Sequence, residues 1–263
     1  MQQANAESER SVVRRALMVL DCFLGNTEER TVTQISRETG LPMATVHRLL
    51  ATLIEWGGVE RHGRGRYRLS MHVWRLGASA PHARALRDVA LPFLEDLREA
   101  THEVVHLAVL DGTHALYLEK LPSRQAATVI SRVGRRLPLH ATGPGKVLLA
   151  YSSPDLLEQV IAAGLRPITT STIVTESQLR SALAEIRRTG LIVSRNEMTD
   201  GSSSVAAPVF GPGRSIMASL AVVVRSDGVS PTELAPLVRI VASSLSRALT
   251  IEDTSESDGY AGR

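Results

Sequence analysis

Apolar residues recur at every third or fourth position near the start of the chain. This spacing predicts three amphipathic helices, over residues 11–24, 31–39 and 43–56. Thr31 or Thr33 can cap the second helix, and Gly40 can end it. Pro42 is well placed to start the third helix, because its missing N–H costs nothing in a first turn.

Two short predicted strands follow the third helix. They cover residues 59–61 and 67–69 and enclose the sequence Gly63-Arg-Gly-Arg66. Strands separated by a glycine-rich basic tip indicate a β-hairpin. The order helix, short helix, glycine turn, helix and basic hairpin predicts a winged helix-turn-helix domain.

The third helix and the hairpin have the features of a DNA-binding surface. A helix that enters the major groove needs small residues for close approach and long donors near its N-terminal end. From Gly57 to Arg75 five arginines stand against the single acid Glu60. A local basic stripe of this kind indicates nucleic acid, and a solvated charged hairpin is the alternative. The candidate DNA-binding residues are Ala44, Thr45, His47 and Arg48 on the helix and Arg61, Arg64 and Arg66 on the hairpin.

The rest of the chain mixes helices and strands. Residues 77–81 break the composition, and residues 82–101 have a helical pattern that Pro92 should interrupt or kink. Capping boxes that begin at Thr175 and Ser230 open two further helices. The predicted helices are residues 176–189 and 231–249, and the predicted strands are residues 104–110, 114–119, 127–133, 191–194, 204–210 and 216–224. This mixture predicts an α+β domain with a mostly antiparallel sheet.

Three stretches of the chain resemble the isocitrate-lyase-regulator (IclR) family of bacterial transcription factors. They are Leu41-Pro-Met-Ala-Thr-Val-His-Arg-Leu-Leu50, Pro138-Leu-His-Ala-Thr-Gly-Pro-Gly-Lys-Val147, and residues 190–210 with Glu197 and Val205-Ala-Ala-Pro-Val209. The resemblance implies a C-terminal effector-binding domain with a GAF- or profilin-like fold. The expected organisation is a polar tail (1–10), a winged helix-turn-helix domain (11–76), a helical linker (77–101), the effector-binding domain (102–250) and an acidic tail (251–263).

The resemblance also implies an effector site between the sheet and the loop of residues 140–146. Effectors in this family are small metabolites, often organic acids. Gly143 and Pro144 would present backbone to a carboxylate, although Pro144 has no N–H. The effector-binding residues implied are Val129, Leu137, Gly143, Pro144, Ser194, Ser204, Ala221 and Val223.

The chemical nature of the effector depends on these side chains. Ala221 and Val223 stand where some relatives have serine, which favours a pocket more apolar than one for the smallest keto acids. We therefore expect a larger or aromatic carboxylate, and the alternative is that both residues are ordinary core. Arg132, Arg135 and Arg136 either pair with a carboxylate or form a solvated surface cluster.

The composition of the chain argues against several other classes of protein. The chain of 263 residues is 43% apolar and 22% charged with a net charge of +3, which is a globular composition. No unbroken apolar run is longer than that of residues 220–224, which is far short of the ~20 residues of a membrane span. Residues 1–10 are polar, so no secretory signal is expected. Cys22 is the single cysteine, which excludes an internal disulfide and favours the cytoplasm.

Two motifs point to other chemistry. His102-Glu-Val-Val-His106 matches the pattern of zinc hydrolases, which requires a helix. In a strand the four steps span ~13 Å, so both histidines could not reach one zinc at ~2.0–2.1 Å. Gly143-Pro-Gly-Lys146 lacks the first glycine and the final Ser or Thr of a phosphate-binding loop. Neither a metal nor a cofactor is therefore expected.

The expected protein is a ligand-responsive DNA-binding regulator and not an enzyme. Its expected partners are double-stranded operator DNA, an organic acid, and a second copy in a homodimer, with no membrane. The resemblance also implies tetramers through the effector domains in many relatives. Repression of a catabolic operon is the main hypothesis, activation is the alternative, and a metal-dependent hydrolase is the distant one.

Overall fold

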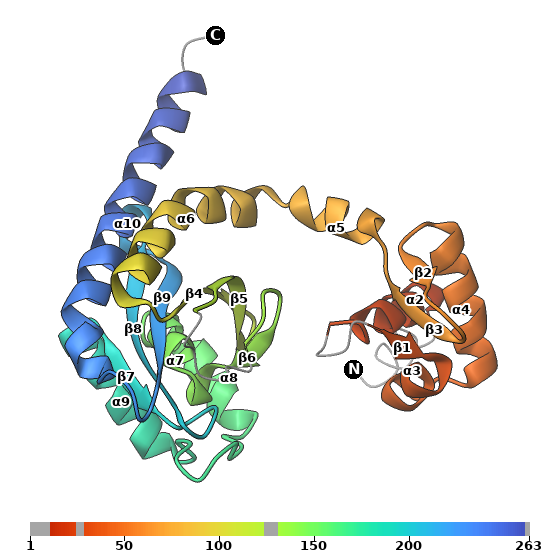
Figure 1. Cartoon of the computed structure of the whole chain (residues 1–263), viewed down its shortest axis with the longest axis horizontal. Coiled ribbons are helices and arrows are strands. Elements are labelled where there is room, and N and C mark those ends of the chain that lie inside the picture. The colour runs from red at the N-terminus through yellow and green to blue at the C-terminus, as the bar shows by residue number, and fades with distance from the viewer. Residues whose placement is uncertain (1–10, 25–28, 124–130, 261–263) are drawn as a thin grey trace. The chain divides into compact units, whose positions relative to one another are not determined.

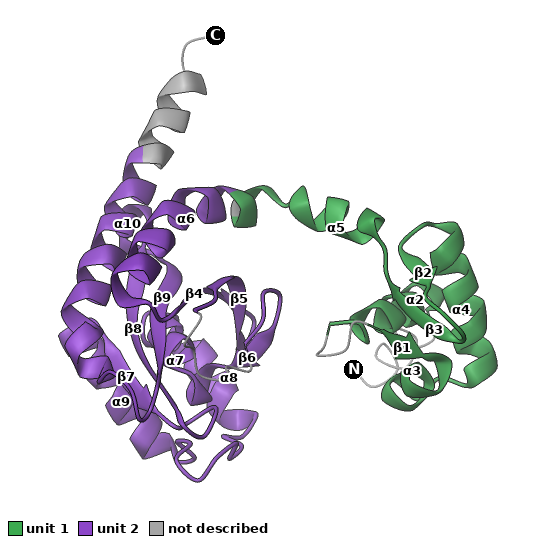
Figure 2. Ribbon diagram, in the orientation of Figure 1, with its two compact units in different colours: residues 1–84 green, residues 85–263 purple. Residues whose placement is uncertain are grey.

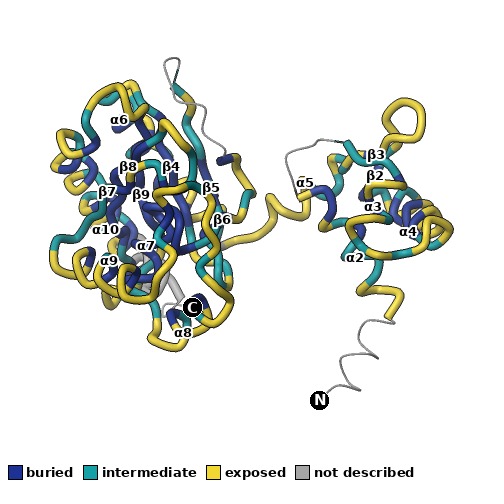
Figure 3. The backbone as a smooth tube through the Cα atoms, turned by 90° about the horizontal axis from the view of Figure 1, so that it is seen from below, coloured by how far each residue is buried: buried dark blue, intermediate teal, exposed yellow. Residues whose placement is uncertain are grey.

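The computed structural model describes residues 11–24, 29–123 and 131–260. These residues form two compact units, residues 1–84 and 85–263 (Figure 2). The boundary falls in the first turns of a helix, α6 (Pro81–Thr101). Each unit has its own buried core (Figure 3).

The first unit is a three-helix domain with a small sheet. Its elements are α2 (Val12–Asp21), β1 (Arg30–Thr31), α3 (Val32–Thr39), α4 (Met43–Glu55), β2 (Val59–Arg61), β3 (Arg66–Leu69) and α5 (Met71–Ala78). The apolar stripes of the first three helices meet in one cluster that includes Val19, Ile35, Val46 and Tyr67. Cys22 is buried in the same cluster, and burial raises the pKa of its thiol to about 11. The predicted winged helix-turn-helix fold is confirmed.

Local interactions fix both ends of α3 before the chain turns into α4. The Thr31 hydroxyl accepts a hydrogen bond from the Gln34 N–H, and the Gln34 side chain accepts one from the Thr31 N–H. This reciprocal pair satisfies two N–H groups that the helix start leaves free. At the other end Gly40 takes a left-handed conformation with φ of 71°, which costs a glycine little. The chain then turns into α4 directly after Pro42.

Two features of the helices after β3 differ from the predictions. Residues 71–78 form α5, which was not predicted, and its start is capped by the Ser70 hydroxyl. Of the two predicted effects of Pro92, the interruption is wrong, because α6 is one helix from Pro81 to Thr101, and the kink stays a prediction. Leu94 and Leu97 are fully buried against the sheet, and we attribute the unbroken helix to this packing, which outweighs the hydrogen bond that Pro92 cannot donate.

The second unit is built on a six-stranded antiparallel sheet with the order β6-β5-β4-β9-β8-β7. The strands are β4 (Val104–Asp111), β5 (His114–Leu121), β6 (Arg136–Pro138), β7 (Ile192–Arg195), β8 (Ser202–Phe210) and β9 (Ile216–Arg225). Every neighbouring pair is antiparallel, as predicted. The predicted strand at residues 127–133 is wrong for residues 131–133, and the remainder lies outside the described residues.

Helices cover both faces of this sheet (Figure 1). They are α7 (Gly143–Ala150), α8 (Pro154–Ala162), α9 (Glu176–Thr189) and α10 (Pro231–Tyr260), together with α6. On β9, Leu220 and Val222 pack against α6 and α10, whereas Ala221 packs with α7 and α9. This alternation follows from the two-residue period of a strand.

The ends of α9 confirm the predicted helix at residues 176–189. The Thr175 hydroxyl accepts a hydrogen bond from the Gln178 N–H, and Gly190 closes the helix in a left-handed conformation. By contrast α7 and α8 were not predicted. All eight residues of α7 are buried, so it has no polar face from which a helical period could be recognised.

The last helix, α10, begins at Pro231 as predicted and extends past the predicted end at residue 249. Its segment Pro231–Ile251 is long and apolar enough to cross a membrane by length and composition alone. Val238, Ala242 and Leu245 of this segment are buried in the cluster formed with α6 and the sheet. The apolar side chains of α10 thus help to form the core of the unit.

Candidate functional site

The helix α4 presents two different faces. Val46, Leu49, Leu50 and Leu53 are buried. Ala44, His47 and Arg48 on the opposite side are exposed and Thr45 is half-buried. Arg48 forms no ion pair with any residue that the structure describes. The first two turns of α4 therefore offer small side chains and an unneutralised donor to a groove of DNA.

The hairpin β2–β3 places basic side chains around a tight turn. Gly63 and Gly65 have φ of 67° and 71°, a region that suits glycine. Arg61 and Arg64 are exposed and have no carboxylate partner within the described parts of the chain. Arg66 is different, because its guanidinium lies 3.3 Å from a carboxylate oxygen of Glu29. Two of the three predicted wing arginines are thus free to bind phosphate.

The second unit contains an inner cavity of about 50 Å³ at the start of α7. Segments that are far apart in the sequence contribute to its wall, including β4, β5, β7, β8 and β9. Six of the predicted effector-binding residues line it, and they are Leu137, Gly143, Pro144, Ser194, Ser204 and Val223.

The other two predicted effector-binding residues have different outcomes. Ala221 is not among the lining residues and packs in the core with α7 and α9. Val129 lies outside the described residues. Arg132, Arg135 and Arg136 do not line the cavity either.

Sequence reasoning predicted Ser194 and Ser204 but missed several other polar side chains of the wall. His106, Tyr117 and Ser131 line the cavity, together with Thr142 and Glu197. The only signal that pointed to any of the first three was the His102-Glu-Val-Val-His106 motif, whose two histidines were excluded as joint zinc ligands in a strand. Hydrogen-bonding groups are therefore more numerous here than the prediction of a comparatively apolar pocket suggested.

His106 is fully buried in β4 as a neutral imidazole. Its Nε2 lies 2.7 Å from the Ser131 hydroxyl, and its ring packs edge-on against Tyr117 at 5.0 Å between centroids. Burial, assisted by the positive charge of Lys120, lowers the pKa of His106 to about 3. His102, in contrast, ends α6 with φ of 57°, so the two histidines do not share a helical face.

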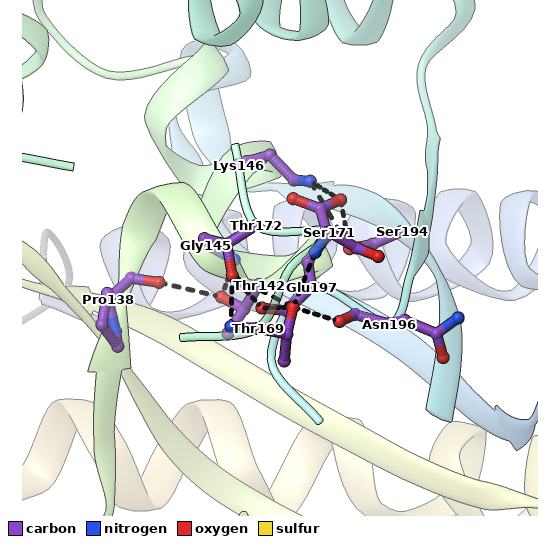
Figure 4. A network of polar contacts seen from close by, with 10 residues as sticks. All are labelled: Pro138, Thr142, Gly145, Lys146, Thr169, Ser171, Thr172, Ser194, Asn196 and Glu197. Atoms are coloured by element: carbon purple, nitrogen blue, oxygen red, sulfur yellow. Dashed lines mark hydrogen bonds and ion pairs between the residues drawn. The ribbon is translucent and has the colours of Figure 1, made fainter. Parts of the chain in front are cut away.

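A buried ion pair lies beside the cavity (Figure 4). The Lys146 ammonium on α7 donates to Glu197 Oε1, and Ser194 donates to the same oxygen at 2.7 Å. Lys146 is fully buried, which lowers the pKa of its ammonium, and the negative charge of Glu197 opposes that effect. The pair ties the first turn of α7 to the end of β7.

The segment around Glu197 is held by two threonines (Figure 4). The Thr169 hydroxyl donates to the Asn196 carbonyl at 2.6 Å, and the Thr172 hydroxyl donates to the Glu197 carbonyl at 2.7 Å. These two hydrogen bonds come from a separate loop and fix the backbone of Glu197. The Glu197 carboxylate is therefore held in position to pair with Lys146.

Glycine is required where α7 approaches the sheet. A Cβ at Gly143 would come within 2.8 Å of the Ser204 hydroxyl, and one at Gly145 would lie 2.6 Å from the Leu139 carbonyl oxygen. The close approach leaves the start of α7 facing the cavity, where the helix dipole favours an anion. Pro144 has no N–H, so fewer backbone donors are present than in an ordinary first turn.

A winged helix-turn-helix unit joined to a second unit with a polar inner cavity defines a ligand-responsive DNA-binding regulator. Two family models match this chain. The model for the IclR helix-turn-helix domain matches residues 12–63, and the model described as "Bacterial transcriptional regulator IclR C-terminal" matches residues 78–247.

Individual proteins agree with the family models. The chain is 34% identical over 242 residues to the HTH-type transcriptional regulator XynR of Escherichia coli, covering 90% of this chain and 96% of XynR. It is 28% identical to the transcriptional repressor IclR of the same organism, covering 83% and 81% of the two chains. It also resembles the crystal structure of an IclR homolog from Microbacterium hydrocarbonoxydans complexed with 4-hydroxybenzoate, with a TM-score of 0.83, 30% identity and coverage of 91% and 99%. The chain belongs to the IclR family of bacterial transcriptional regulators, and it is a regulator rather than an enzyme.

We predict that Lys146→Met will destabilise the second unit by about 3–5 kcal/mol, because it leaves the Glu197 carboxylate buried without its cation. The double variant Lys146→Met/Glu197→Gln removes both charges and should recover most of that loss. Urea denaturation followed by circular dichroism measures both free energies of unfolding. Equal destabilisation by the single and double variants would contradict the role given to the pair.

We further predict that acid weakens the fold through His106. The unfolded chain takes up a proton near the ordinary pKa of 6.5, whereas the folded protein does so only near pH 3, so stability falls as the pH drops below 6.5. Between pH 7 and pH 5 the contribution of this group should fall by about 2 kcal/mol. His106→Gln keeps a polar group beside Ser131 and cannot take up the proton, so its unfolding free energy should change less over the same range. Identical pH dependence in both proteins would refute this assignment.

Proposed function

We propose that this protein represses transcription by binding an operator through α4 and the β2–β3 wing, and that a small carboxylate in the inner cavity modulates this binding. The observation that carries the proposal is the convergence of six effector-binding residues, implied by resemblance alone, on one cavity at the start of α7. The second support is the free polar face of α4 in the same chain.

The proposed DNA contacts fall into two classes. Arg48, with Thr45 and His47, reads base edges in the major groove, where a bidentate arginine discriminates guanine. Ala44 allows close approach. Arg61 and Arg64 bind phosphates or the minor groove, and such contacts position a protein without reading sequence. Arg66 contributes less than these, because Glu29 already offsets its charge.

The proposed effector is a carboxylate, with an aromatic acid as the first class to test. The relative from Microbacterium hydrocarbonoxydans was solved with 4-hydroxybenzoate, an aromatic carboxylate. The start of α7 supplies a favourable dipole, and His106, Tyr117 and Ser131 supply groups that can meet further polar atoms. The cavity of about 50 Å³ is smaller than an ordinary ligand pocket of about 300 Å³ or more. Binding must therefore push part of the wall outward, and this displacement is the proposed origin of the regulatory signal.

The proposed assembly is a homodimer in the cytoplasm that associates further into tetramers. One winged helix buries too little surface for high specificity, so two copies on two half-sites are expected. Effector binding would change the spacing of the two winged helix-turn-helix units in the dimer. Activation remains the alternative outcome, and an acid that tightens operator binding would favour it.

Arg48→Ala should weaken operator binding by about 1–3 kcal/mol and relax base preference at one position. Arg64→Ala is the matched comparison, because it removes an arginine from the wing and should weaken all DNA similarly while reducing the salt dependence. Fluorescence anisotropy on the operator and on point-mutated operators separates the two effects. If Arg48→Ala leaves discrimination between these sequences unchanged, α4 does not read bases through this residue.

The test of the whole proposal is anisotropy of the protein on the DNA just upstream of its own gene, at fixed salt, with aliphatic and aromatic acids added in turn. Release by one acid is the expected result. Val223→Phe should fill the cavity and abolish that release while leaving DNA binding intact, and Val133→Phe, at an exposed position, should behave as the wild type. Sequence-specific binding that no acid alters would overturn the effector site, and binding with no sequence preference would overturn the operator role.

A further inference from the structure

One oxygen of the buried ion pair has no hydrogen-bond partner. Glu197 Oε1 accepts hydrogen bonds from Lys146 and Ser194 (Figure 4). Glu197 Oε2 is also buried, but no donor reaches it from any residue that the structure describes. A buried acceptor without a donor is costly, because it has lost its hydrogen bonds to water and gained none in return. A donor group from outside the chain would therefore be stabilised at this oxygen.

The protein has little means of satisfying this oxygen by itself. The Glu197 side chain is only 9% exposed, and its backbone is held by Thr169 and Thr172. A half-turn of the carboxylate would exchange its two oxygens and again leave one of them without a donor. The need for one more donor is thus a property of the folded chain and not of one rotamer.

The position of Glu197 connects this oxygen with the inner cavity. Glu197 lines the inner cavity and also a larger surface hollow of about 880 Å³ between α9 and β7. Lys146 lines the surface hollow but not the inner cavity. The cation of the ion pair therefore approaches Glu197 from the side of the hollow, which leaves the cavity side of the carboxylate without a positive partner.

The other polar groups of the cavity wall are already engaged. His106 Nε2 and the Ser131 hydroxyl are paired with each other, and the Thr142 hydroxyl caps α7. The Ser194 hydroxyl donates to Glu197 Oε1 at 2.7 Å. Of the side chains that line the inner cavity, Glu197 is the one with a buried polar atom that lacks a partner in the described parts of the chain. The wall therefore requires a ligand that donates a hydrogen bond.

We propose that Glu197 Oε2, the carboxylate oxygen that Lys146 does not hold, accepts a hydrogen bond from the effector. The effector is then an acid that also carries a hydroxyl or amino donor. Its carboxylate lies at the start of α7, and its donor lies at Glu197. A hydrogen bond to an ionised oxygen is short and strong, whereas an acid without the donor leaves Oε2 unsatisfied. This inference rests on the proposed function and specifies the chemistry of its ligand.

The test is isothermal titration calorimetry of the full chain with benzoates that carry a hydroxyl, amino, methyl or cyano group at each ring position in turn. Hydroxyl and amino groups donate, a methyl group of similar size neither donates nor accepts, and a cyano group only accepts. At the preferred position the two donor acids should bind at least about tenfold more tightly than the methyl acid, and the cyano acid should bind most weakly. Hydroxy-, amino- and methyl-substituted butanoates make the same comparison for an aliphatic effector.

Glu197→Gln is the variant that assigns the preference to this oxygen. Lys146 and Ser194 both donate, so they hold the amide carbonyl, and the amide NH₂ takes the place of Oε2. The amino acid should then lose its advantage over the methyl acid, and the cyano acid should gain affinity. Lys146→Met/Glu197→Gln removes both charges of the pair and gives the same measurement if the single variant is too unstable to titrate.

Glu103→Gln is the matched control. Glu103 Oε2 is likewise buried without a partner among the described residues, but Glu103 does not line the inner cavity. This variant should keep the ligand preference of the wild type, and operator binding by all the variants checks that each protein is folded.

Two kinds of failure can be told apart. If no acid binds the wild type, the effector site of the proposed function is overturned, and this inference falls with it. If acids bind equally well with and without a donor, the proposed function stands and this inference alone is overturned. A donor preference that survives in both Glu197 variants would also overturn it, because another group would then be the acceptor. Equal loss of every acid in these variants would show that Glu197 shapes the wall without selecting a donor, which contradicts the inference as well.

Discussion

The second unit depends on one ion pair that is almost wholly buried. Lys146 is fully buried in the first turn of α7, and the Glu197 carboxylate supplies the charge that makes this burial tolerable. A buried charge that loses its partner is costly, so the helix start, the end of β7 and the segment held by Thr169 and Thr172 must keep their mutual positions. The inner cavity lies among these same elements. Its shape is therefore set by an electrostatic requirement as much as by packing.

The sheet gives this arrangement a rigid support. Alternate residues of β9 enter different cores, with Leu220 and Val222 toward α6 and α10 and Ala221 toward α7 and α9. Both faces of the sheet are therefore closely packed. α6 belongs to one of these cores and is also the covalent connection to the first unit. In the proposed regulation, α6 is the segment through which a displacement of the cavity wall would act on the first unit.

The elements that the sequence predicted well are those with a strong local signal. A cap at Thr31 or Thr33, the glycine at 40 and the apolar stripe of α4 located the DNA-binding unit, and the capping box at Thr175 located α9. The helix α7 was missed because burial on all sides removes its polar face, while Gly143, Pro144 and Gly145 are typical of a loop. Several residues of the cavity wall were also not predicted. His106, Tyr117 and Ser131 come into contact only after three separate segments fold together. No pattern along the sequence therefore predicts that these three residues lie side by side.

A cavity this small has a kinetic consequence. If the proposed effector binds here, a ligand larger than the space of about 50 Å³ has to displace part of the wall to enter, so the frequency of that displacement would limit the rate of capture. The same displacement would be needed for release, which would lengthen the residence time of the ligand. The proposed regulator would then respond to sustained changes in metabolite concentration more than to brief ones. The stiffness of the cavity wall would set how long a change must last before transcription follows it.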